Sequence, residues 1–292
     1  MSTTRLAFDP RDVRGSDSFL QREFPMSAKN YQTVSALAYL HSGIVLTDIK
    51  QEMVYSRLAR RLRELALRDF DGYVVRLETG WEEEASEFLN AITTNLTFYF
   101  RENHHFEYLA ETVIPHLKKI HARDRRIRVW SSAASTGEEP YSIAMVLKEG
   151  FSESNWDIKI LATDLDSNVL ATAKAGIYHN DRIATMSKER QRRWFSPVDE
   201  EHVIVDPELA KMMTFKRLNL LHEWPMKGFF DVVFCRNVII YFDKETQSKL
   251  FIKMHKLMGP ESHLFIGHSE SLLDAASLFK ALGRTVYKRV GS

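Results

Sequence analysis

The sequence is poor in cysteine, glycine and proline, and it lacks any long apolar run. Its 292 residues include 1 Cys, 12 Gly and 8 Pro. The single cysteine, Cys235, cannot form an internal disulfide, and the N-terminus lacks the basic and then apolar segments of a secretory signal. The longest apolar runs, such as Val232 to Cys235 and Val238 to Phe242, are far shorter than the ~20 residues that span a bilayer. We therefore expect a cytoplasmic protein without membrane insertion.

An excess of charge of one sign is also missing. The chain has 40 Lys and Arg against 39 Asp and Glu, which gives a formal net charge of +1. Nothing global therefore attracts this protein to nucleic acid or to anionic lipid, and we expect no nucleic-acid partner. The 44% hydrophobic and 27% charged residues are typical of a folded globular protein. The length suggests two domains, at roughly 150 residues each.

Hydrophobic periodicity divides the chain into parts of different character. Residues 1–24 have no apolar periodicity and are predicted to form a tail, whereas 25–92 show helical spacing and predict a small all-helical N-terminal domain. Residues 93–120 are predicted to form a linker, and 121–292 an α/β domain with a mainly parallel, doubly wound sheet. Residues 177–212 are too long for a simple connection and predict an inserted small β-subdomain. The predicted strands are Ile127–Trp130, Ile158–Ala162, Thr214–Arg217, Asp231–Phe234, Leu264–Gly267 and Thr285–Lys288.

The ends of these strands carry the candidate binding residues, because ligands of open α/β sheets bind beyond the carboxyl ends of the strands. The first strand runs into a loop of small residues, Ser131 to Gly137, followed by Glu138 and Glu139. This loop lacks the GxGxxG pattern, and its two carboxylates would repel a pyrophosphate at the start of the next helix. A cationic ligand therefore fits this loop better than a dinucleotide.

Three further strand ends suit a nucleoside. Asp164 follows the second strand, where ribose hydroxyls are bound in nucleotide folds, although a lone Asp there is more often a helix cap. Asn219-Leu220 and Asn237-Val238 each offer an amide and an apolar neighbour, which suit adenine. Together these features describe a pocket for a phosphate-free nucleoside with a positive centre, and S-adenosylmethionine matches that description.

Three long motifs resemble the CheR family of chemotaxis receptor methyltransferases. They are Trp130 to Ser142 (WSSAASTGEEPYS), Arg236 to Asp243 (RNVIIYFD) and Gly267 to Ser271 (GHSES), and the similarity runs from about residue 27 to the C-terminus. The resemblance implies a doubly wound S-adenosylmethionine-dependent methyltransferase sheet. It also implies transfer of a methyl group to glutamate carboxylates on the cytoplasmic helices of chemoreceptors, in chemotaxis adaptation. The products are then glutamate methyl esters and S-adenosylhomocysteine.

A fourth motif lies in the linker and implies a lid over the cofactor. Asn95 to Glu102 (NLTFYFRE) resembles the family pattern Asn-x-Thr-x-Phe-Phe-Arg-Glu, with Tyr99 in place of the first Phe. By this resemblance the cofactor is bound by Asn95, Thr97, Arg101, one of Glu138 and Glu139 at its amino group, Asp164 at the ribose, and Asn219, Leu220, Asn237 and Val238 around the adenine. Which of the two glutamates makes the contact stays open.

The expected chemistry needs no general base, because a glutamate carboxylate with a pKa of about 4.3 is already ionised at pH 7. We expect Arg101 or Arg236 to orient the incoming carboxylate. Tyr241 is a candidate for the substrate mouth, with a buried tyrosine at a sheet end as the alternative. His104-His105, His268 and Cys235 have no recognisable ligand spacing, so no metal is predicted.

The helical domain offers a candidate docking surface. An apolar stripe at helical spacing, which includes Leu58 and Leu62, is flanked by arginines that only Glu64 opposes. These are Arg57, Arg60, Arg61, Arg63 and Arg68. We expect them to bind a glutamate-rich receptor bundle, with a solvated helix face as the alternative.

The predicted insertion, residues 177–212, corresponds to a small β-subdomain that binds a receptor C-terminal tail peptide in some family members. The sequence leaves open whether this chain binds such a peptide, and nothing in it demands more than a monomer. The sequence leaves two alternative functions. One is a cofactor-sensing scaffold without catalysis, against which the retained pocket residues argue, and the other is an RNA methyltransferase, which the near-zero net charge disfavours.

Overall fold

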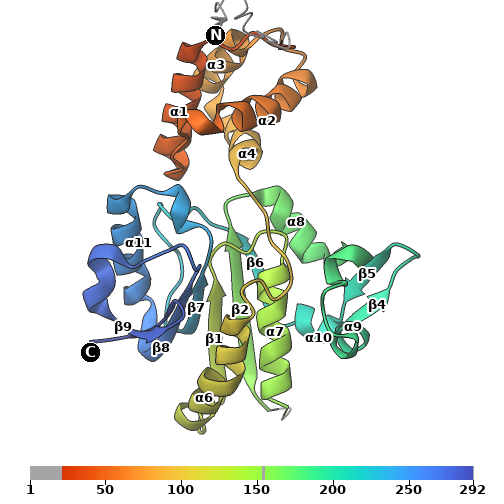
Figure 1. Cartoon of the computed structure of the whole chain (residues 1–292), viewed down its shortest axis with the longest axis vertical. Helices are drawn as coiled ribbons and strands as arrows, with labels where there is room; N and C mark the ends of the chain where they lie inside the picture. The colour runs from red at the N-terminus through yellow and green to blue at the C-terminus, as the bar shows by residue number, and fades with distance from the viewer. Residues whose placement is uncertain (1–21, 153–154, 292) are drawn as a thin grey trace, which may run out of the picture.

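The computed structural model describes residues 22–152 and 155–291, and Figure 1 shows two main bodies joined by an extended segment. The predicted tail, residues 1–24, lies mostly outside the described residues. Its described end is not solvated throughout, because Phe24 is 7% exposed and packs into the helical core.

The N-terminal body is helical, with α1 (Ala28–Ser42), η1 (Asp48–Lys50), α2 (Gln51–Glu64), α3 (Phe70–Thr79) and α4 (Trp81–Ile92). Local signals set the ends of these helices. Ser27 and Asn30 form a capping box at the start of α1, and Gly43 ends that helix in the left-handed conformation with φ 71°. Asp69 accepts from the backbone of Gly72 at the start of α3. The predicted apolar stripe of α2 is buried against α4.

The second body is built on a seven-stranded sheet in the order β6-β2-β1-β7-β8-β10-β9. Its strands are β1 (Arg126–Ser131), β2 (Asp157–Asp164), β6 (Met213–Arg217), β7 (Phe230–Cys235), β8 (Met258–Ile266), β9 (Phe279–Gly283) and β10 (Val286–Arg289). The first five in spatial order pair in parallel, and β10 is antiparallel to both β8 and β9. The carboxyl ends of five strands therefore meet at one rim, as the predicted doubly wound fold requires.

Two strand predictions were incomplete. β8 begins at Met258, not at Leu264, because Gly259 and Pro260 interrupt the apolar pattern and the pairing with β7 shifts register there. β9 was missed altogether, since this edge strand is exposed over most of its length and has no alternating apolar residues.

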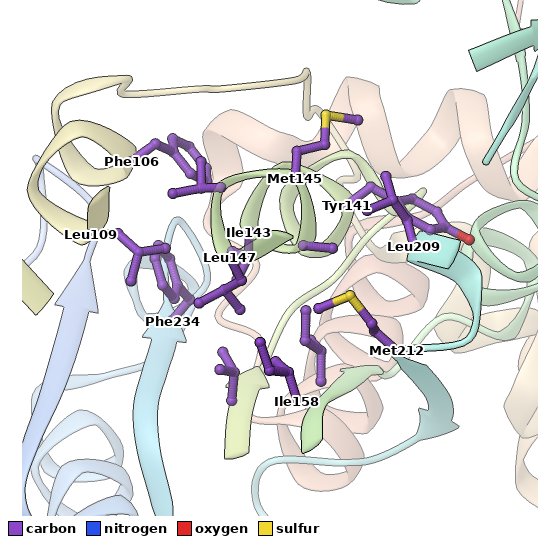
Figure 2. Packing of buried hydrophobic residues seen from close by; sticks show 14 of the residues in the cluster. Phe106, Leu109, Tyr141, Ile143, Met145, Leu147, Ile158, Leu209, Met212 and Phe234 are labelled. Atoms are coloured by element: carbon purple, nitrogen blue, oxygen red, sulfur yellow. The ribbon is translucent and has the colours of Figure 1, made fainter. Parts of the chain in front are cut away.

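Helices cover the faces of the sheet: α7 (Glu138–Gly150), α8 (Ser167–Ala175), α11 (Lys244–Lys256), and the run α5 (His104–Tyr108), η2 (Leu109–Val113), α6 (Ile114–Ile120). η2 is a π-helical turn. Figure 2 shows side chains of α7 pointing toward Phe106 and Leu109 from this run and toward Phe234 of β7. The prediction of a linker over 93–120 therefore holds only for its first part, because the residues from His104 onward are helical and contribute to the core of the sheet body.

The predicted inserted β-subdomain is present beside the main sheet (Figure 1). It contains β3 (Ile177–His179), η3 (Asn180–Ile183), α9 (Lys188–Trp194), β4 (Phe195–Pro197), β5 (His202–Val205) and α10 (Pro207–Ala210). Its three antiparallel strands are ordered β3-β5-β4, so β3 and β4 are edge strands. η5 (Leu273–Leu278) and η4 (Ile239–Tyr241) complete the described elements.

Candidate functional site

A cavity lies at the carboxyl rim of the main sheet, and Asn95, Thr97 and Arg101 of the extended segment that joins the two bodies are part of its wall. Residues of both bodies line the cavity. Those of the helical body include Ile44, Leu46, Lys50 and Met53. Among the predicted site residues the cavity is lined by Asn95, Thr97, Arg101, Glu139, Asp164, Asn219, Leu220, Arg236, Asn237, Val238 and Tyr241.

The two adjacent glutamates at the start of α7 face different surroundings. Glu139 borders the cavity, where its carboxylate accepts from Ser131 Oγ at 2.8 Å and from Arg236 Nη1 at 3.0 Å. Burial raises the pKa of Glu139. Glu138 instead accepts from Thr136 Oγ1 at 2.6 Å and pairs with Arg182 of η3. Of the pair, Glu139 is therefore the one placed to meet a ligand, and Glu138 ties the small subdomain to α7.

Asp164 ends β2 at the cavity wall. Its carboxylate accepts backbone hydrogen bonds from Ser135 at 2.8 Å and from Asp166 at 3.0 Å. Burial nevertheless raises the pKa of Asp164 to about 6. The helix cap of α8 is Asp166, which accepts from the backbone of Asn168 at 2.8 Å. Asp164 is therefore not needed as a helix cap, and its carboxylate lies at the cavity.

The extended segment is fixed to the loops that follow β1 and β2. Asn95 donates from Nδ2 to Asp166 Oδ2 at 2.7 Å, and its carbonyl accepts from Ser135 Oγ at 2.9 Å. Arg101 donates from Nη1 to the carbonyl of Leu96 at 2.8 Å, which closes the segment on itself. Thr97, within the segment, is buried. The segment thus covers the cavity in a defined conformation.

The two asparagines of the expected adenine region are held by their surroundings. Asn219 donates from Nδ2 to the carbonyl of His41 at 2.6 Å and accepts from the backbone of Leu221 at 3.0 Å. Asn237 has φ 57° and donates to Glu102 Oε1 at 3.3 Å. Gly267 must be small here, because a Cβ added to it would lie 2.6 Å from Asn237 Nδ2. Leu220 and Val238 supply the neighbouring apolar surface.

Comparison with known proteins identifies the family of the chain. The model of the CheR methyltransferase SAM-binding domain matches residues 95–288, and that of the CheR methyltransferase all-alpha domain matches residues 29–93. The chain belongs to the CheR methyltransferase family. The resemblance seen in the motifs is therefore confirmed, and this CheR protein is an S-adenosylmethionine-dependent methyltransferase.

Relatives of this CheR protein match over nearly their whole length. The chemotaxis protein methyltransferase of Klebsiella aerogenes is 43% identical over 275 residues, which cover 92% of each chain. Chemotaxis protein methyltransferase 2 of Pseudomonas aeruginosa is 42% identical over 277 residues, 93% of this chain and 97% of that one. The chemotaxis protein methyltransferase of Escherichia coli is 43% identical over 271 residues, 90% of this chain and 91% of that one.

Two glutamates near the cavity were missed as functional residues. Glu270 is buried and accepts backbone hydrogen bonds from Gly267, Asn237, Val238 and Ile239 at 2.6 to 3.0 Å, so it holds the loop after β7. The GHSES motif contained this residue, but no spacing rule gave it a role.

Glu102 ends the extended segment. Burial would raise its pKa, but His268 and Arg236 outweigh burial and lower the pKa of Glu102 to about 2.

Arg236 forms the floor of the cavity. It is 4% exposed, and its Nη atoms lie 3.0 Å from Glu139 Oε2 and 3.3 Å from Glu102 Oε2. It also donates to the carbonyl of Arg101. Its Nη groups are therefore already engaged, which leaves Arg101 as the freer of the two arginines at the cavity. Tyr241 is half-buried at the cavity wall, with Lys50 Nζ 5.2 Å from the centre of its ring.

The arginines of α2 lie outside the cavity, and the premise that only Glu64 opposes them is wrong. Arg61 pairs with the buried Glu84 at 2.7 Å, and Arg63 with Glu23 at 3.0 Å. Arg57 donates to the carbonyls of Ile92 and Thr93 at the end of α4. Groups from other segments therefore pair with or hydrogen-bond to several of these arginines. Helical spacing within α2 alone did not reveal these partners. Arg60 and Arg68 are exposed.

Within the described part of the chain, no helix combines the length and the apolar character that crossing a bilayer requires.

Proposed function

We propose that this protein methylates glutamate side chains on the cytoplasmic helices of chemoreceptors, with S-adenosylmethionine as donor and S-adenosylhomocysteine as product. One observation carries the proposal: Glu139 and Asp164 present two carboxylates to one cavity, which the Asn95–Arg101 segment covers. Family membership and the names of the chemotaxis methyltransferase relatives support it. The reaction then takes place in the cytoplasm, where receptor helices of this kind are exposed.

The residues of the cavity fit the proposed donor. Asp164 is proposed to accept the ribose hydroxyls and Glu139 the amino group, while Asn219-Leu220 and Asn237-Val238 frame the adenine. Lys50, Arg101 and Arg236 supply the cations of the wall, and Arg236 is already paired with Glu139. The acidic start of α7 disfavours a phosphate there and favours a ligand with a positive centre.

S-adenosylmethionine supplies an electrophilic methyl group on a positively charged sulfur. The receptor carboxylate is ionised at pH 7, so the chain needs no general base and its residues act by positioning. Orientation of two reacting groups can lower a barrier by at most ~7–11 kcal/mol, and exclusion of water strengthens the attraction between the anion and the sulfonium. The Asn95–Arg101 segment provides the cover that excludes water.

Arg101 is proposed to orient the incoming carboxylate, because it lines the cavity and has its Nη1 bound only to a carbonyl of its own segment. Arg236 is proposed as a positioning residue that fixes Glu139. Tyr241 is proposed to line the substrate mouth together with Lys50. The Arg101→Ala variant tests the first of these roles: we expect reduced methyl transfer, and unchanged transfer with unchanged cofactor affinity would remove Arg101 from it.

Receptor docking is proposed to involve the exposed arginines Arg60 and Arg63 of α2, together with Arg68 in the connection between α2 and α3. The arginines engaged by the fold, Arg57 and Arg61, are proposed to shape this surface rather than contact the receptor. An edge strand of the small subdomain, β3 or β4, is proposed to pair with a receptor tail peptide, as in some family members. We propose that the enzyme acts as a monomer.

The deciding experiment is calorimetric titration of the full chain with S-adenosylmethionine and S-adenosylhomocysteine, followed by transfer of a radiolabelled methyl group to receptor-containing membranes. We expect binding of both nucleosides and base-labile label on the receptor. Binding without transfer to any receptor would support the scaffold alternative, and absence of binding would overturn the proposal. Titration with a receptor-tail peptide tests the tether separately.

A further inference from the structure

A cluster of histidines and a glutamate lies at the end of the cover segment, on the far side of Arg236 from Glu139. Glu102, His104 and His105 each offer one ligand atom, and these atoms lie within 4.8 Å of one another. His268 adds a contact from the loop after β8, with its Nδ1 2.9 Å from Glu102 Oε1. The proposed methyl transfer assigns no role to the three histidines.

The ring of His105 has a defined tautomer. Its Nε2 lies 2.9 Å from the carbonyl oxygen of Arg284 and 3.0 Å from Thr285 Oγ1. A carbonyl oxygen only accepts hydrogen bonds, so Nε2 carries a proton, and in the neutral form of the ring Nδ1 presents a lone pair. The side chain of His105 is 0% exposed. The Nδ1 atom of this buried ring lies near the carboxylate of Glu102.

That lone pair faces another acceptor. His105 Nδ1 lies 3.6 Å from Glu102 Oε2, and among the described residues neither atom has a hydrogen-bond partner. The other carboxylate oxygen, Oε1, accepts from His268 and from Asn237. The guanidinium of Arg236 lies 3.3 Å from Oε2, but the same guanidinium also pairs with the carboxylate of Glu139. Two buried acceptors that face each other are unfavourable unless a cation or a donor lies between them.

We propose that Glu102 Oε2, His105 Nδ1 and a ring nitrogen of His104 bind one zinc-class divalent transition metal ion, with the fourth position open to water. Imidazole and carboxylate ligands suit zinc at about 2.0–2.2 Å, and two such ligands on a tetrahedral ion lie roughly 3.3 Å apart. The observed 3.6 Å needs only a small adjustment.

The surroundings supply the other features of a metal site. His268 and Arg284 bind the outer atoms of two ligands, Glu102 Oε1 and His105 Nε2, and such contacts orient metal ligands. A surface opening lined by His104, His268, Arg284 and Thr285 gives an entry path. No metal was expected from the sequence, because His104-His105, His268 and Cys235 show no recognisable ligand spacing and Glu102 was not counted among the candidates. An ion here ties the end of the cover segment to the first turn of α5.

The test is calorimetric titration of the full chain, freed of metal with a chelator, with ZnCl₂. We expect one tight equivalent that the His104→Ala variant weakens at least tenfold. His104 is half-buried and its removal spares the core, whereas His105→Ala would leave a cavity. The matched control is His202→Ala, because His202 and His179 form a rival pair on the small subdomain with ring centres 5.7 Å apart. This control should retain the tight equivalent.

A second readout uses Co²⁺, whose visible absorption reports its coordination. The wild-type chain should give a Co²⁺ spectrum that ZnCl₂ abolishes and that His104→Ala lacks. The proposal is overturned if the chain takes up no zinc at micromolar concentration, since an ordered water would then satisfy the two acceptors. It is equally overturned if His104→Ala and wild type bind zinc with the same affinity, or if only His202→Ala loses the tight equivalent.

Discussion

Two buried clusters of arginine and glutamate, one in each body, differ in how completely their polar atoms are paired. In the helical body Glu84 is 0% exposed and accepts from Arg61 at 2.7 and 2.9 Å, from Arg76 at 3.1 Å and from Tyr73 at 3.2 Å. Burial would raise the pKa of Glu84, but the two arginines outweigh it and lower this pKa. One anion with two cations and a hydroxyl is fully satisfied.

The cluster at the cavity has the opposite ratio of charges, with one cation for two anions. One guanidinium, that of Arg236, lies between the carboxylates of Glu102 and Glu139. Burial raises the pKa of Glu139, and Arg236 Nε and Glu102 Oε2 have no hydrogen-bond partner among the described residues. Since unpaired buried polar atoms are costly, a fold retains them where something else binds. Complete pairing thus marks a structural cluster, and incomplete pairing beside a cavity marks a binding site.

The largest effect is expected at the satisfied cluster. The Glu84→Ala variant leaves Arg61 and Tyr73 without their shared partner, and breaking a buried pair in this way costs about 3–5 kcal/mol of the free energy of unfolding. Urea denaturation of the full chain measures it. Arg60→Ala is the matched control, because Arg60 is 80% exposed and pairs only with Glu64 at the surface. A loss at Glu84 no larger than that at Arg60 would contradict the structural assignment.

Substitution of a carboxylate at the cavity should change ligand affinity more than the free energy of unfolding, unlike substitution of Glu84. The Asp164→Asn variant removes a buried charge but also one backbone hydrogen bond, so we expect the free energy of unfolding to change by less than about 1.5 kcal/mol. Loss of a charged hydrogen bond to the ribose should weaken S-adenosylhomocysteine binding by about 1.5–3 kcal/mol, roughly 10- to 150-fold. Calorimetry measures the affinity. A large loss of stability with unchanged affinity would make Asp164 a structural residue.

The two neighbouring glutamates provide a matched pair. Glu139→Gln should weaken S-adenosylhomocysteine binding about tenfold, because it removes the charge that faces the amino group, a difference of about 1.4 kcal/mol. Glu138→Gln should leave this affinity within about twofold, since Glu138 pairs with Arg182 outside the cavity. Parallel titration of the two variants gives the ratio. Equal losses, or a greater loss from Glu138→Gln, would contradict the assignment of Glu139.

Local sequence signals predicted many of the residues that line this cavity, because a parallel sheet brings the residues at its strand ends together. Asp164, Asn219 and Asn237 each follow a strand, and parallel strands bring their carboxyl ends to one rim whatever the intervening chain does. The fold class followed from the alternation of strand and helix. The small antiparallel sheet followed from an interval too long for a connection. These inferences needed no knowledge of tertiary contacts.

The features that sequence reasoning missed depend on contacts between distant segments. Glu84 is 23 residues from Arg61, which it neutralises, and Glu102 is 166 residues from His268. Helical spacing on α2 showed the arginines but not these partners. The choice between Glu138 and Glu139 likewise depended on where Arg182 and Arg236 lie in space. Adjacent residues of the same type carry no signal that separates them.

Acid should weaken the site through Asp164. Its pKa of about 6 lies above the usual value because of burial, so the free protein takes up a proton on this carboxylate as the pH falls through 6. A protonated carboxyl accepts the ribose hydroxyls less well. We therefore expect S-adenosylhomocysteine affinity to be constant above pH 7 and to fall up to about tenfold per pH unit below pH 6. Asp164→Asn should flatten this profile, and a profile that the substitution leaves unchanged would assign the titration to another group.

The smallest effect is expected at two exposed arginines, Arg60 on α2 and Arg68 just after it. The double variant Arg60→Ala, Arg68→Ala removes two surface charges, and exposed charges contribute at most about 1 kcal/mol each. We expect the KM for receptor membranes to rise a few-fold at low salt, the KM for S-adenosylmethionine to stay constant, and the difference to vanish at high salt through screening. Arg57→Ala would confuse this test, because Arg57 binds the end of α4. If the double variant methylates receptors as well as wild type at low salt, these arginines form a solvated face and receptor recognition lies elsewhere.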